Sequence, residues 1–138
     1  MGIKFVISDP STKKSHQLDV EKDKVVTIFN KKIGEDISGD HLGLHGYTLK
    51  ITGGSDKDGF PMRPDVEGIG RKRILIGESI GFHPTIKGER KRRTVRGNTI
   101  SEDTHQVNLK VIKAGAKSLE ELHPSKKKEE KPAEAPKQ

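Results

Sequence analysis

A dense run of basic residues occupies positions 87–96, where six Lys or Arg accompany a single Glu. Across positions 71–96 there are nine basic and two acidic residues, so this window carries +7, which equals the formal net charge of the whole 138-residue chain. Such a cluster repels itself unless it faces an anion, and nucleic-acid phosphates repeat at a matching spacing. The sequence therefore predicts nucleic-acid binding. The nine candidate contacts are Arg71, Lys72, Arg73, Lys87, Arg90, Lys91, Arg92, Arg93 and Arg96.

The type and setting of these residues favour phosphate binding over a merely solvated surface. Four of the six cations in positions 87–96 are Arg, whose planar guanidinium can bind a phosphate through two hydrogen bonds. Gly88 and Gly97 bracket the run and Pro84 precedes it, which predicts a loop held at both ends by ordered structure. A solvated loop without a ligand is the alternative interpretation.

The elements that must hold this loop are predicted to be mainly β-strands. Apolar patterning predicts strands at residues 3–7, 16–20, 47–52, 71–76 and 106–112, the first two forming a hairpin. β character resumes at residues 94–95 and 98–100, so the basic loop would lie between two strands. In the strand at 71–76, Ile74 and Ile76 would be buried on one side and Leu75 partly on the other. In the last strand, Val107, Leu109 and Val111 would point inward.

Two short segments fit a helix. Residues 24–33 suit a short helix or a strand equally well, and periodicity does not decide between them. Residues 118–122 could form one capped helical turn. From residue 117 onward the composition changes to Lys, Glu, Ala and Pro, which predicts a flexible tail at 117–138 after a domain at 1–116.

Composition limits the remaining possibilities. Hydrophobic residues make up 29% of the chain, so any core is small. No cysteine is present, which excludes a disulfide framework and a thiol nucleophile. No apolar run reaches the ~18–20 residues of a membrane span, and the first residues do not form a secretory signal. The cytoplasm is the expected compartment.

The Gly-rich segment at residues 53–62 invites two chemical interpretations that we judge weak. Asp56 and Asp58 suggest a calcium loop or a small hydrolase, but no acid occupies the first calcium-ligand position and no partner for catalysis is evident. His41 and His45 have the spacing of a helical metal pair, yet a third ligand is missing. We therefore expect a tight connection whose glycines adopt positive φ and whose Phe60 and Met62 enter the core.

The same segment resembles a known family signature. Its pattern of an apolar and a small residue, Gly-Gly-x-Asp, two variable residues and Gly-x-Pro-Met is similar to that of archaeal and eukaryotic small-subunit ribosomal protein six. The matching signature residues are Gly53, Gly54, Asp56, Gly59, Pro61 and Met62. Residues 88–97 resemble the second family block at the expected spacing. The short chain without a long basic, serine-rich end is closer to the archaeal branch.

The resemblance implies a compact antiparallel, β-barrel-like domain that contacts small-subunit ribosomal RNA and neighbouring ribosomal proteins. It implies no enzymatic activity, cofactor, metal or small-molecule substrate. Positions 53–62 would then act as a structural loop and the nine basic residues as RNA contacts. A polybasic membrane-surface or partner-docking module remains the main alternative, although no amphipathic helix or lipidation signal accompanies the charge.

Overall fold

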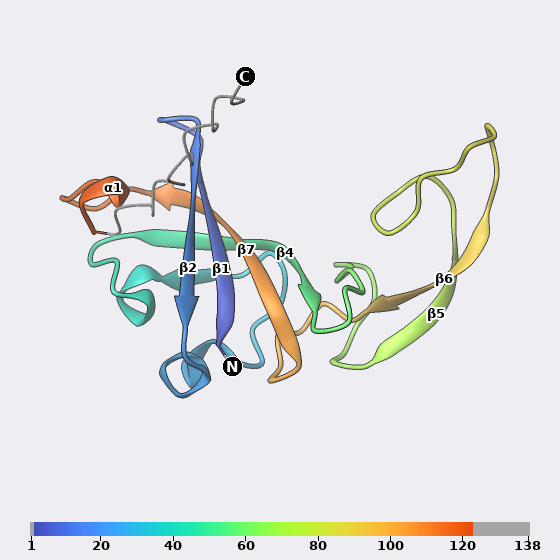
Figure 1. Ribbon diagram of the computed structural model, residues 1–138, viewed down its shortest axis with the longest axis horizontal. Helices are drawn as coiled ribbons and strands as arrows, with labels where there is room; N and C mark the ends of the chain where they lie inside the picture. Colours follow the sequence, from blue (N-terminus) through green and yellow to red (C-terminus); the bar gives the residue numbers. More distant parts are fainter. Residues whose placement is uncertain (1, 123–138) are drawn as a thin grey trace, which may run out of the picture.

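The computed structural model describes residues 2–122, and a five-stranded sheet forms its larger part (Figure 1). The strands are β1 (Ile3–Asp9), β2 (Lys14–Val20), β3 (Asp36–Ser38), β4 (Thr48–Asp56) and β7 (Thr104–Lys113), in the order β2-β1-β7-β4-β3. The prediction of a mainly β fold is confirmed, as is the first hairpin, in which Phe5 lies opposite Leu18. One pair departs from the antiparallel expectation: β1 and β7, far apart in sequence, run parallel.

The core of the sheet follows from strict alternation along its strands. In β1 every second side chain from Ile3 onward is buried, and in β7 Val107, Leu109 and Val111 point inward as predicted. Three register shifts in the β4–β7 pair bend the sheet, because an extra residue on one strand increases the local twist.

Short helical turns close the ends of this sheet. The 3-10 helix η1 (Lys22–Ile28) overlaps the first part of the undecided segment at residues 24–33 and buries Val25 and Ile28. A second 3-10 turn, η2 (Gly39–Leu42), follows β3. No helix within residues 2–122 is long and apolar enough to cross a membrane.

The segment after β7 packs back onto the sheet. Ser118 caps helix α1 (Leu119–Leu122) as predicted, because its hydroxyl accepts the Glu121 N–H at 3.4 Å. Leu119 is buried in the core, and the Tyr47 hydroxyl donates to the Lys117 carbonyl at 2.6 Å. The predicted tail at 117–138 therefore begins with packed residues, while residues 123–138 lie outside the described part of the chain.

A two-stranded sheet extends away from the five-stranded one. Strands β5 (Arg71–Ile76) and β6 (Lys91–Arg96) pair antiparallel, and Figure 1 shows them projecting to one side. We call residues 71–96 the arm. Three of its apolar residues, Ile76, Phe82 and Val95, are buried but do not belong to the main core. The arm is therefore a distinct part of the fold.

The structure corrects two expectations about the arm. Most of the predicted basic loop is the strand β6, and only residues 87–90 belong to the connection. The sequence did not reveal this strand, because a strand with cations on both faces lacks the alternation of apolar and polar residues that identifies a strand. The prediction for Leu75 was also wrong: its side chain is 55% exposed, and Ile74 is only half-buried.

Candidate nucleic-acid interface

The cations of the arm lie on both faces of its two strands. Residues opposite each other in an antiparallel pair share a face. Arg73 lies opposite Thr94 and Leu75 opposite Arg92, while on the other face Ile74 lies opposite Arg93. The exposed cations are Arg71, Lys72, Arg73, Lys87, Arg90, Lys91, Arg92 and Arg93. Eight of the nine predicted contacts are thus accessible on one structural unit.

Most of these accessible cations lack an acidic partner. Within residues 2–122 no carboxylate lies within 4.0 Å of Lys72, Arg73, Lys87, Arg90, Arg92 or Arg93. Lys91 and Arg71 are the exceptions. The Lys91 ammonium lies 3.4 Å from the Glu89 carboxylate, and Arg71 pairs with the carboxylates of Asp56 and Asp58. An arm with this much unneutralised charge can bind a polyanion with little loss of internal ion pairs.

Arg96 differs from the other eight predicted contacts. Its side chain is only 5% exposed, and its guanidinium lies 3.2 Å from the Asp56 carboxylate. A second guanidinium nitrogen donates to the Ser101 hydroxyl at 2.8 Å. We therefore assign Arg96 a structural role and leave it out of the proposed RNA contacts.

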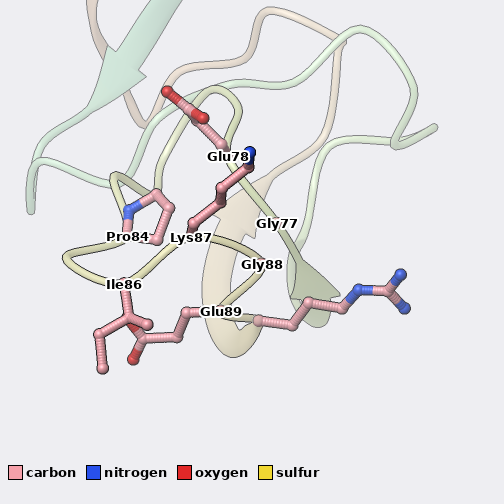
Figure 2. Close-up of a pocket in the computed structure, with 8 residues that line it drawn as sticks. Gly77, Glu78, Pro84, Ile86, Lys87, Gly88 and Glu89 are labelled. Atoms are coloured by element: carbon pink, nitrogen blue, oxygen red, sulfur yellow. The ribbon is translucent and has the colours of Figure 1, made fainter.

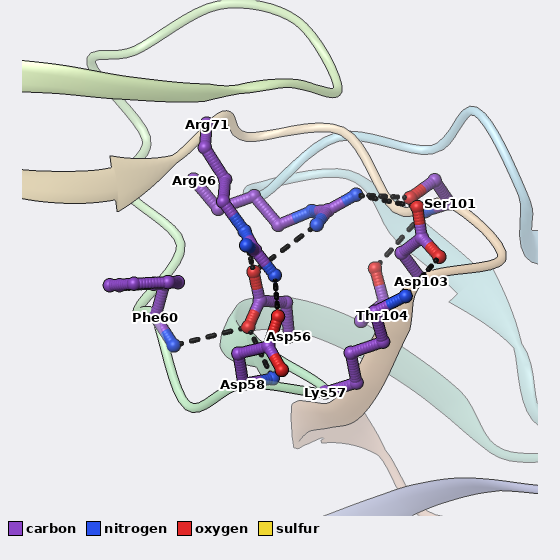
Figure 3. A network of polar contacts seen from close by, with 9 residues as sticks. All are labelled: Asp56, Lys57, Asp58, Phe60, Arg71, Arg96, Ser101, Asp103 and Thr104. Atoms are coloured by element: carbon purple, nitrogen blue, oxygen red, sulfur yellow. Dashed lines mark hydrogen bonds and ion pairs between the residues drawn. The ribbon is translucent and has the colours of Figure 1, made fainter.

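Asp56 is the centre of a polar network at the base of the arm (Figure 3). Its fully buried carboxylate accepts hydrogen bonds from Arg71 Nε at 2.7 Å and from Arg96 at 3.2 Å. It also accepts the backbone N–H groups of Asp58 at 2.8 Å and Phe60 at 3.1 Å. Arg71 contacts Asp58 as well. The network therefore joins β4 to both strands of the arm.

The pKa of Asp56 reflects these contacts. Burial alone would raise the pKa, but hydrogen bonds from Arg71, from the two backbone N–H groups and from Arg96 outweigh it and hold the pKa below its usual value. The carboxylate is thus ionised at neutral pH and balances two guanidinium groups. This role was missed in the sequence, where Asp56 suggested calcium or catalysis. An acid in a Gly-rich turn gives no sign of basic partners 15 and 40 positions away.

The signature segment and the basic block meet at this base. The Arg96 N–H donates to the Pro61 carbonyl at 2.8 Å, and the Met62 N–H donates to the Gly54 carbonyl at 3.0 Å. Met62 is buried as predicted, whereas Phe60 is only half-buried, with the Arg71 guanidinium 4.7 Å from the centre of its ring. The two blocks therefore form one structural unit.

The three signature glycines occupy positions that differ in backbone conformation and in the space around them. Gly53 and Gly54 lie inside β4, which corrects the expectation that both occupy a turn with positive φ. A Cβ at Gly54 would lie 2.4 Å from the Gln106 carbonyl oxygen. Glycine is therefore required here because β4 comes close to β7. Gly59 alone among the three has positive φ, at 86°.

Replacing Gly59 with Ala should lower the free energy of unfolding by about 1–2 kcal/mol. No atom lies within 4 Å of a Cβ at this position, so the cost comes from the backbone conformation. Gly53→Ala is the matched control, because it has the same open space without positive φ. Urea unfolding of both variants measures the difference. Equal free energies of unfolding would show that the positive φ of Gly59 is not what requires glycine.

A shallow pocket near the tip of the arm mixes both signs of charge (Figure 2). It has a volume of about 400 Å³ and includes Glu78, Glu89, Lys87 and Arg90 in its lining. Two carboxylates beside two cations make it a poor site for a phosphate. Within residues 2–122 no three His, Asp or Glu side chains lie close enough together to bind a metal ion, and His45 instead contacts Asp40 at 3.3 Å.

Comparison with known proteins decides the family. The model of the family described as ribosomal protein S6e matches residues 3–124. The chain belongs to the ribosomal protein S6e family. Among similar proteins, the small ribosomal subunit protein eS6 of Methanocella arvoryzae is 49% identical over 127 residues, which cover 92% of this chain and 89% of that protein.

Other archaeal S6e proteins are similar over comparable lengths. The small ribosomal subunit protein eS6 of Methanocaldococcus jannaschii is 49% identical over 119 residues, covering 86% of this chain and 88% of that protein. The protein of the same name from Archaeoglobus fulgidus is 48% identical over 131 residues, covering 94% of this chain and all of that protein. The expected family resemblance is confirmed.

Proposed function

We propose that this S6e chain is a non-catalytic structural constituent of the cytoplasmic small ribosomal subunit and binds ribosomal RNA through the arm. The relatives named above are small-subunit proteins, which supports the assembly. The observation that carries the RNA-binding assignment is the set of exposed arm cations without acidic partners in residues 2–122. These are Lys72, Arg73, Lys87, Arg90, Arg92 and Arg93.

The mechanism separates positioning from binding. The Asp56 network fixes the base of the arm to β4. The base of the arm is therefore held in place before RNA binds. Residues two apart on a strand are about 6.6 Å apart, which spreads the cations along the arm instead of concentrating them at one point. Affinity then comes mainly from the release of counterions from the RNA, and orientation comes from shape. Neighbouring ribosomal proteins would contact the remaining surface.

Sedimentation of lysates from cells that make this chain tests the assignment. At moderate salt, the protein should travel with small subunits and polysomes in a nearly one-to-one amount. Raising the salt should release it, because phosphate contacts weaken as counterions become abundant. Recovery mainly in the soluble fractions at moderate salt would contradict the ribosomal role, and recovery with membranes would favour the polybasic membrane-surface alternative.

A further inference from the structure

A second pocket lies where the arm meets the signature segment, and it differs from the pocket at the tip. Its volume is about 330 Å³. It is lined by Phe60, Pro61, Arg73, Gly81, Arg92, Arg93 and Thr94. Three of these residues are Arg and none is acidic. The pocket is therefore a concave site with a positive charge.

The pocket lies beside the outer edge of β6. The Arg96 N–H points to this edge, where it donates to the Pro61 carbonyl. Backbone N–H groups two residues apart on a strand point to the same edge, so the Thr94 N–H faces the edge as well. The site thus offers a backbone donor and a hydroxyl in addition to its guanidinium groups.

Gly81 is the one glycine among the residues that line the pocket. Gly81 has φ of 94°, and a Cβ there would lie 3.1 Å from the Pro61 ring and 3.4 Å from Val95. Arg93 extends over Phe82, with its guanidinium 5.5 Å from the ring centre. Arg73 and Arg92 have no such aromatic partner among the described residues. Those two are the free cations of the site.

We infer that this pocket holds one RNA nucleotide that has left the helical stack. The inference rests on the proposed function and names a site within the arm. The phosphate binds Arg73 and Arg92, whose forked guanidinium groups suit a tetrahedral oxyanion. The base lies against Pro61 and against the Phe60 ring, on the face opposite the one that Arg71 covers, since Arg71 does not line the pocket. An aromatic face can stack on any base.

The size and shape of the pocket favour a nucleotide over a bare backbone phosphate. A volume of about 330 Å³ falls within the roughly 300–1,000 Å³ of small-molecule sites, and a phosphate group alone would leave much of it unfilled. A base stacked inside a duplex cannot reach such a site, whereas bases in loops and bulges can. The partner is therefore a single-stranded or bulged position of the RNA.

The test uses the full chain and hexauridylate as the probe. In the parent protein, titration with hexauridylate should shift the amide NMR signals of Gly81 and Thr94 more than those of Lys22 and Lys31. Arg92→Lys keeps the charge but removes the fork, and it should weaken hexauridylate binding about 5–10-fold, as expected for loss of one bidentate contact. Lys22→Arg is the matched control, because it also keeps the charge but lies outside the arm, and it should change binding less than about 2-fold.

A second variant tests whether binding depends on the shape of the pocket or only on its positive charge. Thr94→Leu narrows the site with an aliphatic side chain, which offers no aromatic face to a base, while every cation stays. It should therefore also weaken hexauridylate binding, and thermal melts should show that it remains folded. Equal binding by the parent, Arg92→Lys and Lys22→Arg, with no selective shift at Gly81 and Thr94, would overturn the inference. Tighter binding of hexaglutamate than of hexauridylate would do the same, because it would indicate an acidic peptide as the ligand.

Small-subunit ribosomal RNA is titrated with the same variants. If the parent binds this RNA but Thr94→Leu and Arg92→Lys bind it as tightly as the parent, the pocket inference fails and the proposed function stands. If the parent itself does not bind this RNA, the proposed function fails.

Discussion

Replacing Asp56 with Ala should destabilise the protein by about 3–5 kcal/mol, as is typical when one partner of a buried ion pair is removed. The Asp56 carboxylate has no exposed side-chain surface and holds the guanidinium of Arg96, which is only 5% exposed. Without the carboxylate, the buried Arg96 would keep only the exposed Asp103 carboxylate, 3.8 Å from its guanidinium, as an ionic partner. The Asp58 and Phe60 N–H groups would also lose their acceptor. Chemical denaturation measures the loss.

Asp58→Ala is the matched control for Asp56→Ala. Asp58 also contacts Arg71, but its side chain is 52% exposed, so its ion pair should contribute less than about 1 kcal/mol. A difference of at least about 2 kcal/mol between the two variants is expected. Equal destabilisation would contradict the central role of the Asp56 network at the base of the arm.

The same network predicts how stability depends on pH. The pKa of Asp56 is lower in the folded protein than its ordinary value of 3.8. A carboxyl group whose pKa is depressed by folding contributes stability above its unfolded pKa and loses it as pH falls through the folded value. The parent should therefore lose stability as pH falls below about 4, and Asp56→Ala should show a smaller loss over the same interval.

The strands of the main sheet were predictable because their sequence alternates on a two-residue period. Phe5 and Leu18 identify the first hairpin, and Val107, Leu109 and Val111 identify β7. These patterns are local, so one segment contains all the information that they require. The parallel pairing of β1 with β7 could not be predicted in this way, because it joins segments about 100 positions apart.

The arm and its base were harder to predict for two physical reasons. In β6 the exposed cations on both faces replace the apolar alternation that identifies a strand, so its residues resembled a loop. Arg96 belongs to the same basic run as Arg93. It is nevertheless buried, because Asp56 from another part of the chain compensates its charge. The position of Asp56 at the end of β4 distinguishes the two arginines, and that position depends on the tertiary fold.

Replacing Arg90, Lys91, Arg92 and Arg93 together with Gln should sharply reduce RNA binding and leave the fold nearly as stable. All four side chains are exposed, and their removal relieves repulsion among like charges. The cation–π contact of Arg93 with Phe82 limits the gain, since such contacts are worth about 0.5–1 kcal/mol at exposed sites. Thermal melts should therefore show a midpoint close to that of the parent.

Binding should change in its salt dependence as well as its strength. Each phosphate contact contributes about 0.9 to the slope of log K against log salt, taking the duplex DNA value as a guide. Loss of four contacts should lower the slope by about 3–4. The matched control replaces Lys22, Lys24, Lys31 and Lys32 with Gln. It removes the same charge from a region where Lys24 lies 3.8 Å from Glu21 and Lys31 lies 3.8 Å from Glu35.

Titration of small-subunit ribosomal RNA across a salt series, with the parent and both quadruple variants, tests the role of the arm most directly. We expect the arm variant to lose affinity and about 3–4 units of salt slope, while the lysine control stays close to the parent. Equal losses in the two variants would show that binding follows total charge, and the arm would not be the RNA-binding site.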